Sequence, residues 1–116
     1  MGVDQLKASV SAAGSYTLVA LAGESDMNTR QVLRDVLEQA TSEPPRHLVI
    51  DMSGLEFIDS TAMHVLMDVR AGFAGDGGHI SIVAPHPLIA RVLSLSGTDQ
   101  IVPVYPDLAA ALAAEG

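Results

Sequence analysis

The amino-acid sequence predicts one α/β domain over residues 1–116, with a mostly parallel central β-sheet, an N-terminal hairpin and about four helices. The chain has 116 residues, of which 48% are hydrophobic, which is enough for one core and leaves little room for a second. Two alternating apolar stretches open the chain, and short apolar runs then alternate with stretches of helical period. The predicted order is therefore β-β-α-β-α-β-α-(β)-α, with helices joining parallel strands.

The N-terminal hairpin is predicted from residues 6–10 and 16–22, in which apolar positions alternate on either side of a turn at 12–15. Residues 24–29 follow, and they are rich in side chains that cap helices. A first helix is expected next, because apolar residues recur with helical spacing before Pro44 and Pro45 stop it. These apolar residues are Val32, Leu33, Val36, Leu37 and Ala40.

A buried strand and a second helix are predicted for the middle of the chain. Residues 47–51 form a short continuous apolar run, which is typical of a strand buried on both faces. Residues 52–59 are interpreted as a connection that leads to Ser60. A helical stripe follows, and glycines between positions 72 and 78 end it. The stripe consists of Ala62, Val65, Leu66, Val69 and Phe73, with Met63 beside it.

The C-terminal part is predicted to contain a strand, a helix, an edge strand and a last helix. Residues 79–84 have the pattern of a strand, and Pro87 suits the first turn of the helix after it. Residues 101–104 form a short strand at a sheet edge, since Pro103 lacks an N–H group, and an Ala- and Leu-rich helix follows. The third helix is expected to bury Leu88, Ile89, Val92, Leu93 and Leu95.

Composition excludes several classes of function. The net charge is −8, with 6 basic and 14 acidic residues, so binding to nucleic acid or to an anionic membrane surface is not expected. There is no cysteine, and the histidines at positions 47, 64, 79 and 86 lack metal-ligand spacing, so no metal site or cofactor is expected. The sequence shows no signal-peptide pattern and no apolar stretch near the roughly 20 residues of a spanning helix, so a cytoplasmic protein without membrane insertion is expected.

The densest polar cluster is Asp59-Ser60-Thr61, at the predicted start of the second helix. Crevices at the carboxyl ends of parallel strands commonly hold the functional site of such sheets. A phosphate on a hydroxyl at a helix start gains from the helix dipole and from unpaired N–H groups of the first turn. Asp, Ser and Thr are also the preferred N-cap residues, and the local pattern alone favours this simpler explanation.

The longer sequence around Ser60 favours a functional site over simple helix capping. It runs Val49-Ile-Asp51-Met-Ser53-Gly-Leu55-Glu-Phe57-Ile-Asp59-Ser60-Thr61-Ala-Met-His-Val-Leu66. Leu21-Ala-Gly23-Glu24-Ser-Asp26 stands before the first predicted helix, and Gly77-Gly78, Val92-Leu93 and Ser96-Gly97 follow later in the same order. In these motifs the chain resembles the STAS-domain anti-sigma factor antagonists over almost its whole length.

The resemblance implies a STAS-like fold and a partner-switching function. In that family the serine after the second aspartate accepts phosphate, which here is Ser60, with Thr61 as the runner-up. The unmodified antagonist binds an anti-sigma factor that is also a serine kinase, and a sigma factor is thereby freed. Phosphorylation then releases the antagonist, and a phosphatase resets the cycle.

The resemblance also implies a partner surface. Asp59 is expected either to act on the acceptor hydroxyl or only to cap the helix, and Asp26 is both a candidate partner contact and a candidate N-cap. Ala62 stands where the family usually has glycine, and its methyl group is expected to obstruct a partner and to alter partner choice or phosphorylation. The expected partner-binding residues are Glu24, Asp26, Asn28, Asp59, Thr61, Ala62 and Met63.

Two other functions remain open from the sequence. STAS domains also serve as subunits of membrane transport complexes, including a partner of a lipid-transport ATPase, and such a subunit would lack the phosphorylation switch. An enzyme with Ser60 as its nucleophile is disfavoured, since Ser60 lies in no G-x-S-x-G elbow and no base lies near it in the sequence. A protein without enzymatic activity is therefore expected.

Overall fold

A computed structural model describes residues 5–84 and 86–115, and in it five strands form one sheet in the order β1-β2-β3-β4-β5. β1 pairs with β2 antiparallel, and the other neighbouring strands are parallel, as predicted. No helix of the described residues is long and apolar enough to cross a membrane. The elements are β1 (Leu6–Ala12), β2 (Thr17–Ser25), the 3-10 turn η1 (Met27–Thr29), α1 (Arg30–Thr41), β3 (His47–Ile58), α2 (Ser60–Gly75), β4 (His79–Val83), α3 (Pro87–Leu95), the 3-10 turn η2 (Thr98–Gln100), β5 (Val104–Tyr105) and α4 (Leu108–Glu115).

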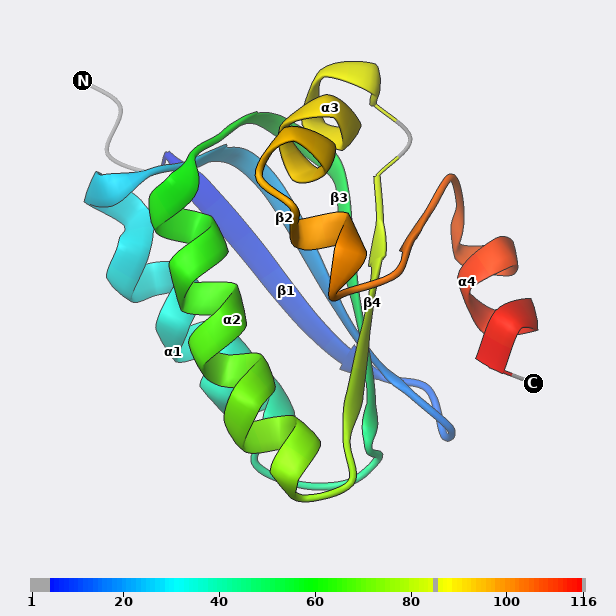
Figure 1. The fold of residues 1–116 in the computed structure, drawn as a ribbon. Coiled ribbons are helices and arrows are strands. Elements are labelled where there is room, and N and C mark those ends of the chain that lie inside the picture. Colours follow the sequence, from blue (N-terminus) through cyan, green and yellow to red (C-terminus); the bar gives the residue numbers. More distant parts are fainter. Residues whose placement is uncertain (1–4, 85, 116) are drawn as a thin grey trace.

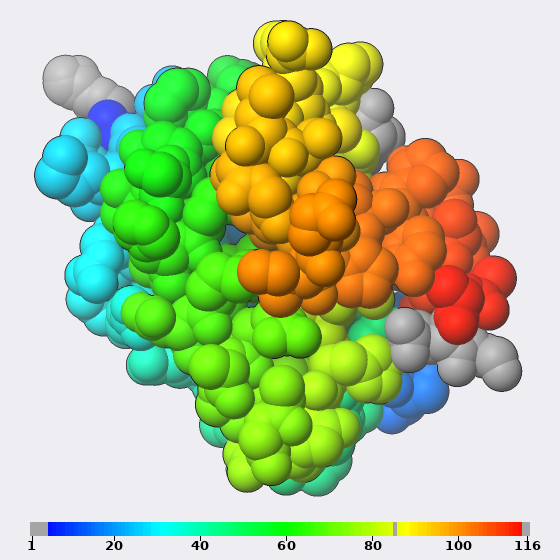
Figure 2. Space-filling view, in the orientation of Figure 1, coloured from blue at the N-terminus to red at the C-terminus, as the bar shows by residue number. Residues whose placement is uncertain are grey.

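Helices cover both faces of the sheet, but unequally (Figure 1). α1 and α2 lie side by side, and with α3 they bury one large core against the sheet, so that the space-filling view shows mainly these helices and η2 (Figure 2). α4 packs on the other face, where Val49, Val83 and Ala111 form a smaller cluster. Leu48 and Ile50 belong to the large core and Val49 to the small one, which confirms that this strand is buried on both faces.

β3 is longer than the sequence indicated, because the expected connection at 52–58 continues as a strand paired with β2. The pairing shifts register between Ala20 and Ala22 and again between Gly23 and Glu24. Gly54 lies inside this irregular stretch, where an added Cβ would come within 2.9 Å of the Leu21 carbonyl oxygen. The bulges break the period-2 alternation, so the sequence pattern did not reveal this part of the strand.

The remaining differences concern exposure and one boundary. Leu88 and Leu95 were expected in the apolar face of α3, but their side chains are 64% and 74% exposed. Val32 on α1 is 47% exposed. The last strand is displaced to Val104–Tyr105, and Pro103 lies beside the sheet edge, where its carbonyl accepts a hydrogen bond from Ile82 N. The hairpin turn, the helix starts and the order of helices and strands along the chain agree with the prediction.

Candidate functional site

Ser60 is the first residue of α2 and its side chain is exposed, as the sequence predicted. Asp59 before it has extended backbone angles, and its Oδ1 accepts hydrogen bonds from Thr61 N at 2.9 Å and Ala62 N at 3.4 Å. The capping interpretation of Asp59 is therefore confirmed. The expectation that the first-turn N–H groups are unpaired is wrong for Thr61 and Ala62, because the Asp59 carboxylate already binds both.

Asp26 occupies the same position at the end of the neighbouring strand. Its Oδ1 accepts hydrogen bonds from Asn28 N at 3.0 Å and Thr29 N at 3.1 Å, and Thr29 Oγ1 accepts one from Asp26 N at 2.9 Å. This reciprocal arrangement is a capping box, and it starts η1, which leads directly into α1. The candidate N-cap role of Asp26 is confirmed, one 3-10 turn earlier than the helix itself.

Strand pairing brings these two capped turns together, although they are far apart in the sequence. Ser25 pairs with Ile58 at the carboxyl ends of β2 and β3, and Asp59 N donates a hydrogen bond to Ser25 O at 3.2 Å. Glu24 pairs with Phe57 one step earlier. The structure therefore joins the Glu24–Asn28 segment and the Asp59–Ser60 segment into one surface, as the carboxyl ends of parallel strands allow.

Exposed apolar side chains lie at the same ends of the strands as these two turns. Met27 is 74% exposed, Phe57 is 48% exposed, and Leu88 lies in the first turn of α3, which follows β4 at the same edge of the sheet. Large exposed apolar groups grouped at one edge are typical of a protein-binding surface. Sequence reasoning missed their role, although each stands within a few residues of a strand end. We call the set the carboxyl-edge surface; it comprises Glu24, Asp26, Met27, Asn28, Phe57, Asp59, Ser60 and Leu88.

Three of the expected partner-binding residues are less accessible than their motif position suggested. Ala62 is 3% exposed and lines a small internal space with Leu33 of α1, and Met63 is 5% exposed. The Met63 sulfur accepts a hydrogen bond from Thr98 Oγ1 at 3.1 Å. In this conformation α2 turns both side chains toward the core, and their contact with a partner stays a prediction. Thr61 is half-buried.

Charge on the carboxyl-edge surface is mainly negative. Glu24, Asp26 and Asp59 contribute carboxylates, and none of the three forms an ion pair with another described residue. The described ion pairs involve Arg34, which binds Glu38 and Asp68 on the flank between α1 and α2. A partner that docks on this edge therefore meets apolar groups with unneutralised carboxylates among them.

The histidines do not form a metal site. Among residues 5–84 and 86–115 no group of three or more His, Cys, Asp or Glu side chains could hold a metal ion. His47 is buried and stacks on His79 with ring centroids 4.4 Å apart, and its Nε2 lies 3.1 Å from Ser81 Oγ. Both histidines begin their strands, so they lie at the opposite end of the sheet from Ser60.

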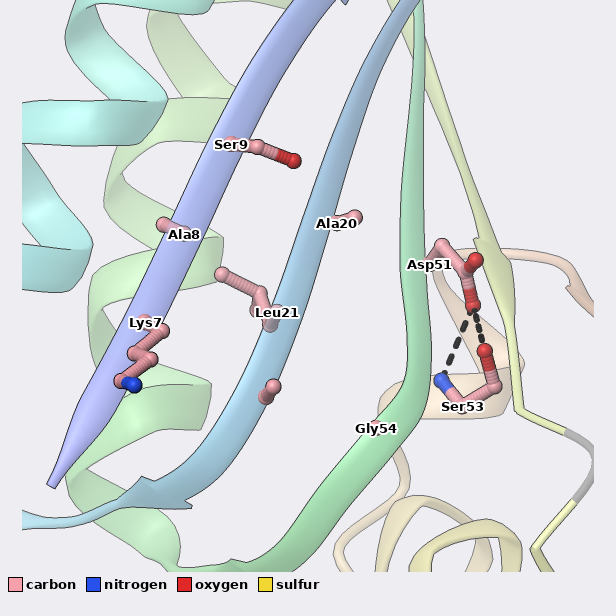
Figure 3. Close-up of a pocket in the computed structure, with 9 residues that line it drawn as sticks. Lys7, Ala8, Ser9, Ala20, Leu21, Asp51, Ser53 and Gly54 are labelled. Carbon is pink, nitrogen blue, oxygen red and sulfur yellow. Dashed lines mark hydrogen bonds between the residues drawn. The ribbon is translucent and has the colours of Figure 1, made fainter.

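A shallow hollow of about 330 Å³ lies on the face of the sheet opposite α1 and α2, and Ser60 does not line it. Lys7 and Ser9 of β1 stand on one side and Asp51 and Ser53 of β3 on the other, with Ala20 on β2 between them (Figure 3). Asp51 Oδ1 accepts hydrogen bonds from the backbone N and the hydroxyl of Ser53. The hollow is separate from the carboxyl-edge surface.

Comparison with known proteins agrees with the fold and the motif. The family model described as "Mlab, STAS domain" matches residues 8–103. The crystal structure of an anti-sigma factor antagonist from Mycobacterium paratuberculosis superposes with a TM-score of 0.88 at 30% identity, covering 97% of this chain and 96% of that one. The anti-sigma F factor antagonist of Paenibacillus polymyxa is 28% identical over 89 residues, 76% of either chain. The anti-sigma-F factor antagonist RsfA of Mycobacterium tuberculosis is 26% identical over 111 residues, 94% of this chain and 87% of that protein.

Proposed function

Because this chain belongs to the STAS domain family, we propose that it is an anti-sigma factor antagonist that is switched by phosphorylation of Ser60. The observation that carries the proposal is the exposed hydroxyl of Ser60 at the start of α2, within a surface of apolar groups and carboxylates. In this proposal the chain binds and releases partners and performs no catalysis itself. Its partners are an anti-sigma factor that is a serine kinase and a phosphatase that removes the phosphate.

The unmodified form binds through the carboxyl-edge surface. Met27, Phe57 and Leu88 supply apolar area, which favours association when it is removed from water. Glu24 and Asp26 favour a partner surface with basic residues, since complementary charges steer and orient binding. The capping bonds of Asp26 and Asp59 hold both turns in place, so little chain ordering opposes docking.

Phosphorylation of Ser60 changes this surface by charge. A phosphoserine adds about −1.5 to −2 charges, and here it stands next to the Asp59 carboxylate. The N–H groups of Thr61 and Ala62 already bind Asp59, so they do not neutralise the phosphate unless that cap opens. To change an almost fully bound population into an almost fully free one, the binding free energies of the two forms must differ by about 5.5 kcal/mol. A desolvated phosphate among carboxylates can supply this difference.

The direct test is phosphorylation with a cognate anti-sigma kinase and ATP, read by mass spectrometry. We expect one phosphate on the natural protein, none on Ser60→Ala, and one on the matched control Thr61→Ala. Loss of the phosphate in Thr61→Ala with its retention in Ser60→Ala moves the acceptor to Thr61. Retention of one phosphate in both variants rejects this helix start as the switch.

A second candidate function is that of a STAS subunit of a membrane transport complex, without a phosphorylation switch at Ser60. The description of the matched family model, which names Mlab, is the observation that favours it. This function predicts co-purification with an ATPase subunit and binding that is independent of Ser60 phosphorylation. The names of the relatives favour the sigma pathway.

A further inference from the structure

The two edges of the sheet differ in how they are protected against pairing with another chain. β5 has two residues and follows Pro103, so it offers little backbone for a further strand. β1 has seven residues, contains no proline, and pairs with β2 in a continuous register without a bulge. Proline, short length, bulges and charges are the usual protections of an edge strand, and β1 has only Lys7. Within the described residues β1 pairs with no other strand.

The backbone groups that β1 leaves open can be assigned from the hairpin. Gln5 O accepts a hydrogen bond from Glu24 N at 2.7 Å, and Ala13 N donates one to Tyr16 O at 2.9 Å. Backbone groups alternate in direction along an antiparallel strand, so the odd-numbered residues of β1 face β2. The N–H and C=O groups of the even-numbered residues therefore point away from the sheet; these are Leu6, Ala8, Val10 and Ala12.

We propose that β1 is the interface with a second copy of this chain, paired antiparallel about a two-fold axis at Ser9. In this register Leu6 lies opposite Ala12 of the second copy, and Ala8 opposite Val10 of the second copy. Every outward backbone group of the four even-numbered residues then has a partner. Lys7 lies opposite Ser11 of the second copy, whereas a register centred on Lys7 would place two ammonium groups together and leave most of the strand unpaired.

Exposed side chains at the same edge support a second copy as the occupant. Val10 is 37% exposed, and it lines a hollow with Gln39 and Glu43 on the α1 side of the sheet. Helical spacing places Val32 on the same side of α1 as Gln39, and Val32 is 47% exposed. In the proposed register Val10 lies next to the two-fold axis, opposite Ala8 of the second copy, so pairing removes part of its apolar surface from water.

The charge on the open face of β1 permits an antiparallel pair of identical chains. In the proposed register Lys7 lies opposite the uncharged Ser11 of the second copy, and Ser9 lies opposite Ser9 of the second copy, so no like charges meet on this face. Lys7 and Ser9 lie on the face that α1 does not cover (Figure 3), so pairing extends that open face without obstruction.

The proposed dimer leaves the carboxyl-edge surface free. The strands of the two copies run in opposite directions, so the two Ser60 side chains lie at opposite ends of the joined sheet. Each copy can then bind its own partner. The proposal does not depend on the proposed function, because it rests on β1 and α1 alone.

The test is the molar mass of the full chain by light scattering or sedimentation, over a range of concentrations. We expect the mass of two chains for the natural protein and of one chain for Ala8→Pro, which removes an outward N–H group at a position that an edge strand tolerates. The matched control Ala8→Ser keeps the N–H group and stays dimeric. A natural protein that is monomeric at every concentration overturns the proposal, as does a folded, dimeric Ala8→Pro variant.

A second variant and a residue-level measurement keep the test decisive if Ala8→Pro does not fold. Val10→Lys places like charges near the two-fold axis and should give monomers, whereas Val10→Thr should remain dimeric. In hydrogen exchange, the amides of Ala8, Val10 and Ala12 should be protected in the natural protein and lose protection in Val10→Lys. Those of Lys7, Ser9 and Ser11 should stay protected in both, since they bind β2. A dimer whose even-numbered amides exchange freely overturns this interface.

Discussion

Asp26 and Asp59 stand at the ends of neighbouring parallel strands and cap the turns that follow, yet the two turns expose different chemistry. In both, the carboxylate accepts hydrogen bonds from the N–H groups two and three residues later. The residue after Asp26 is Met27, which is 74% exposed, and the residue after Asp59 is the exposed Ser60. The same backbone arrangement therefore presents an apolar group on one strand and a modifiable hydroxyl on the next.

The two turns also differ in how the aspartate's own N–H group is satisfied. Asp26 N donates to Thr29 Oγ1 within its own turn, whereas the corresponding position in α2 is Ala62, which has no acceptor. Asp59 N donates instead to Ser25 O on β2. The first turn is closed by its own residues, whereas the second is tied to the last residue of β2, which directly precedes Asp26.

The largest expected effect distinguishes the exposed positions of the two turns. Ser60→Glu places charge where we propose that the phosphate lies, and like charges in an interface cost several kcal/mol, so affinity for the anti-sigma factor should fall about 100-fold or more. Asn28→Asp adds one charge beside Glu24 and Asp26, where we propose that the partner is basic, so affinity should stay unchanged or rise by up to about tenfold. Calorimetric titration measures both, and equal losses would contradict the distinction.

The next prediction concerns the hydrogen bonds of the capping box that Asp26 and Thr29 form. Thr29 is buried, its hydroxyl accepts from Asp26 N and donates to Glu24 O at 3.1 Å, and Thr29→Val removes both bonds. We expect a loss of about 1–3 kcal/mol in the free energy of unfolding, measured with urea. Thr41→Val, at a half-buried position late in α1, serves as the control, and an equal loss there would contradict a special role for the capping box.

A smaller effect tests the burial of Ala62. Ala62→Gly should lower the free energy of unfolding by about 1–2 kcal/mol, from helix propensity and the lost methyl contact. Ala71→Gly, on the exposed side of α2, should lose only the propensity part, about 1 kcal/mol. The rate of Ser60 phosphorylation should be the same in both variants, and a rate change confined to Ala62→Gly would restore a role at the partner surface.

The smallest effect concerns the second cap. Asn and Asp are about equally good N-cap residues, so Asp59→Asn should change the free energy of unfolding by only a few tenths of a kcal/mol, whereas Asp59→Ala should cost about 1 kcal/mol. Thermal unfolding of both variants measures the difference. Equal costs would mean that the charge of Asp59, rather than its hydrogen bonds, stabilises α2.

Much of the fold could be predicted because its local signals agree. The hairpin turn contains Gly14, which has a φ of 77°, and the starts of α2 and α3 coincide with Asp59 and with the His86-Pro87 pair. The end of β3 could not be predicted, since its bulges remove the alternation on which strand prediction depends. The exposure of Leu88 and Leu95 was missed for a different reason: helical spacing does not say how wide a face the core covers.

For the site, the position of Ser60 followed from its motif, but its surroundings did not. Pairing between Ser25 and Ile58 brings Asp26 to Ser60, and long-range pairing is invisible in a single sequence. Ala62 belonged both to the apolar stripe of α2 and to the expected partner surface, and these two predictions conflict. Its burial confirms the helical stripe, whereas its part in partner binding stays a prediction.

Gly23 and the loop after it differ in how much sequence change they tolerate. Its φ is 98°, and an added Cβ would lie 2.1 Å from Gln5 O, so this position rejects every side chain. From Glu24 to Asn28, by contrast, most side chains are solvent-facing and can be exchanged without disturbing the backbone that the cap of Asp26 holds. Under the proposed function, substitution at the exposed Glu24, Met27 and Asn28 changes partner choice while Asp26 and Ser60 keep their places.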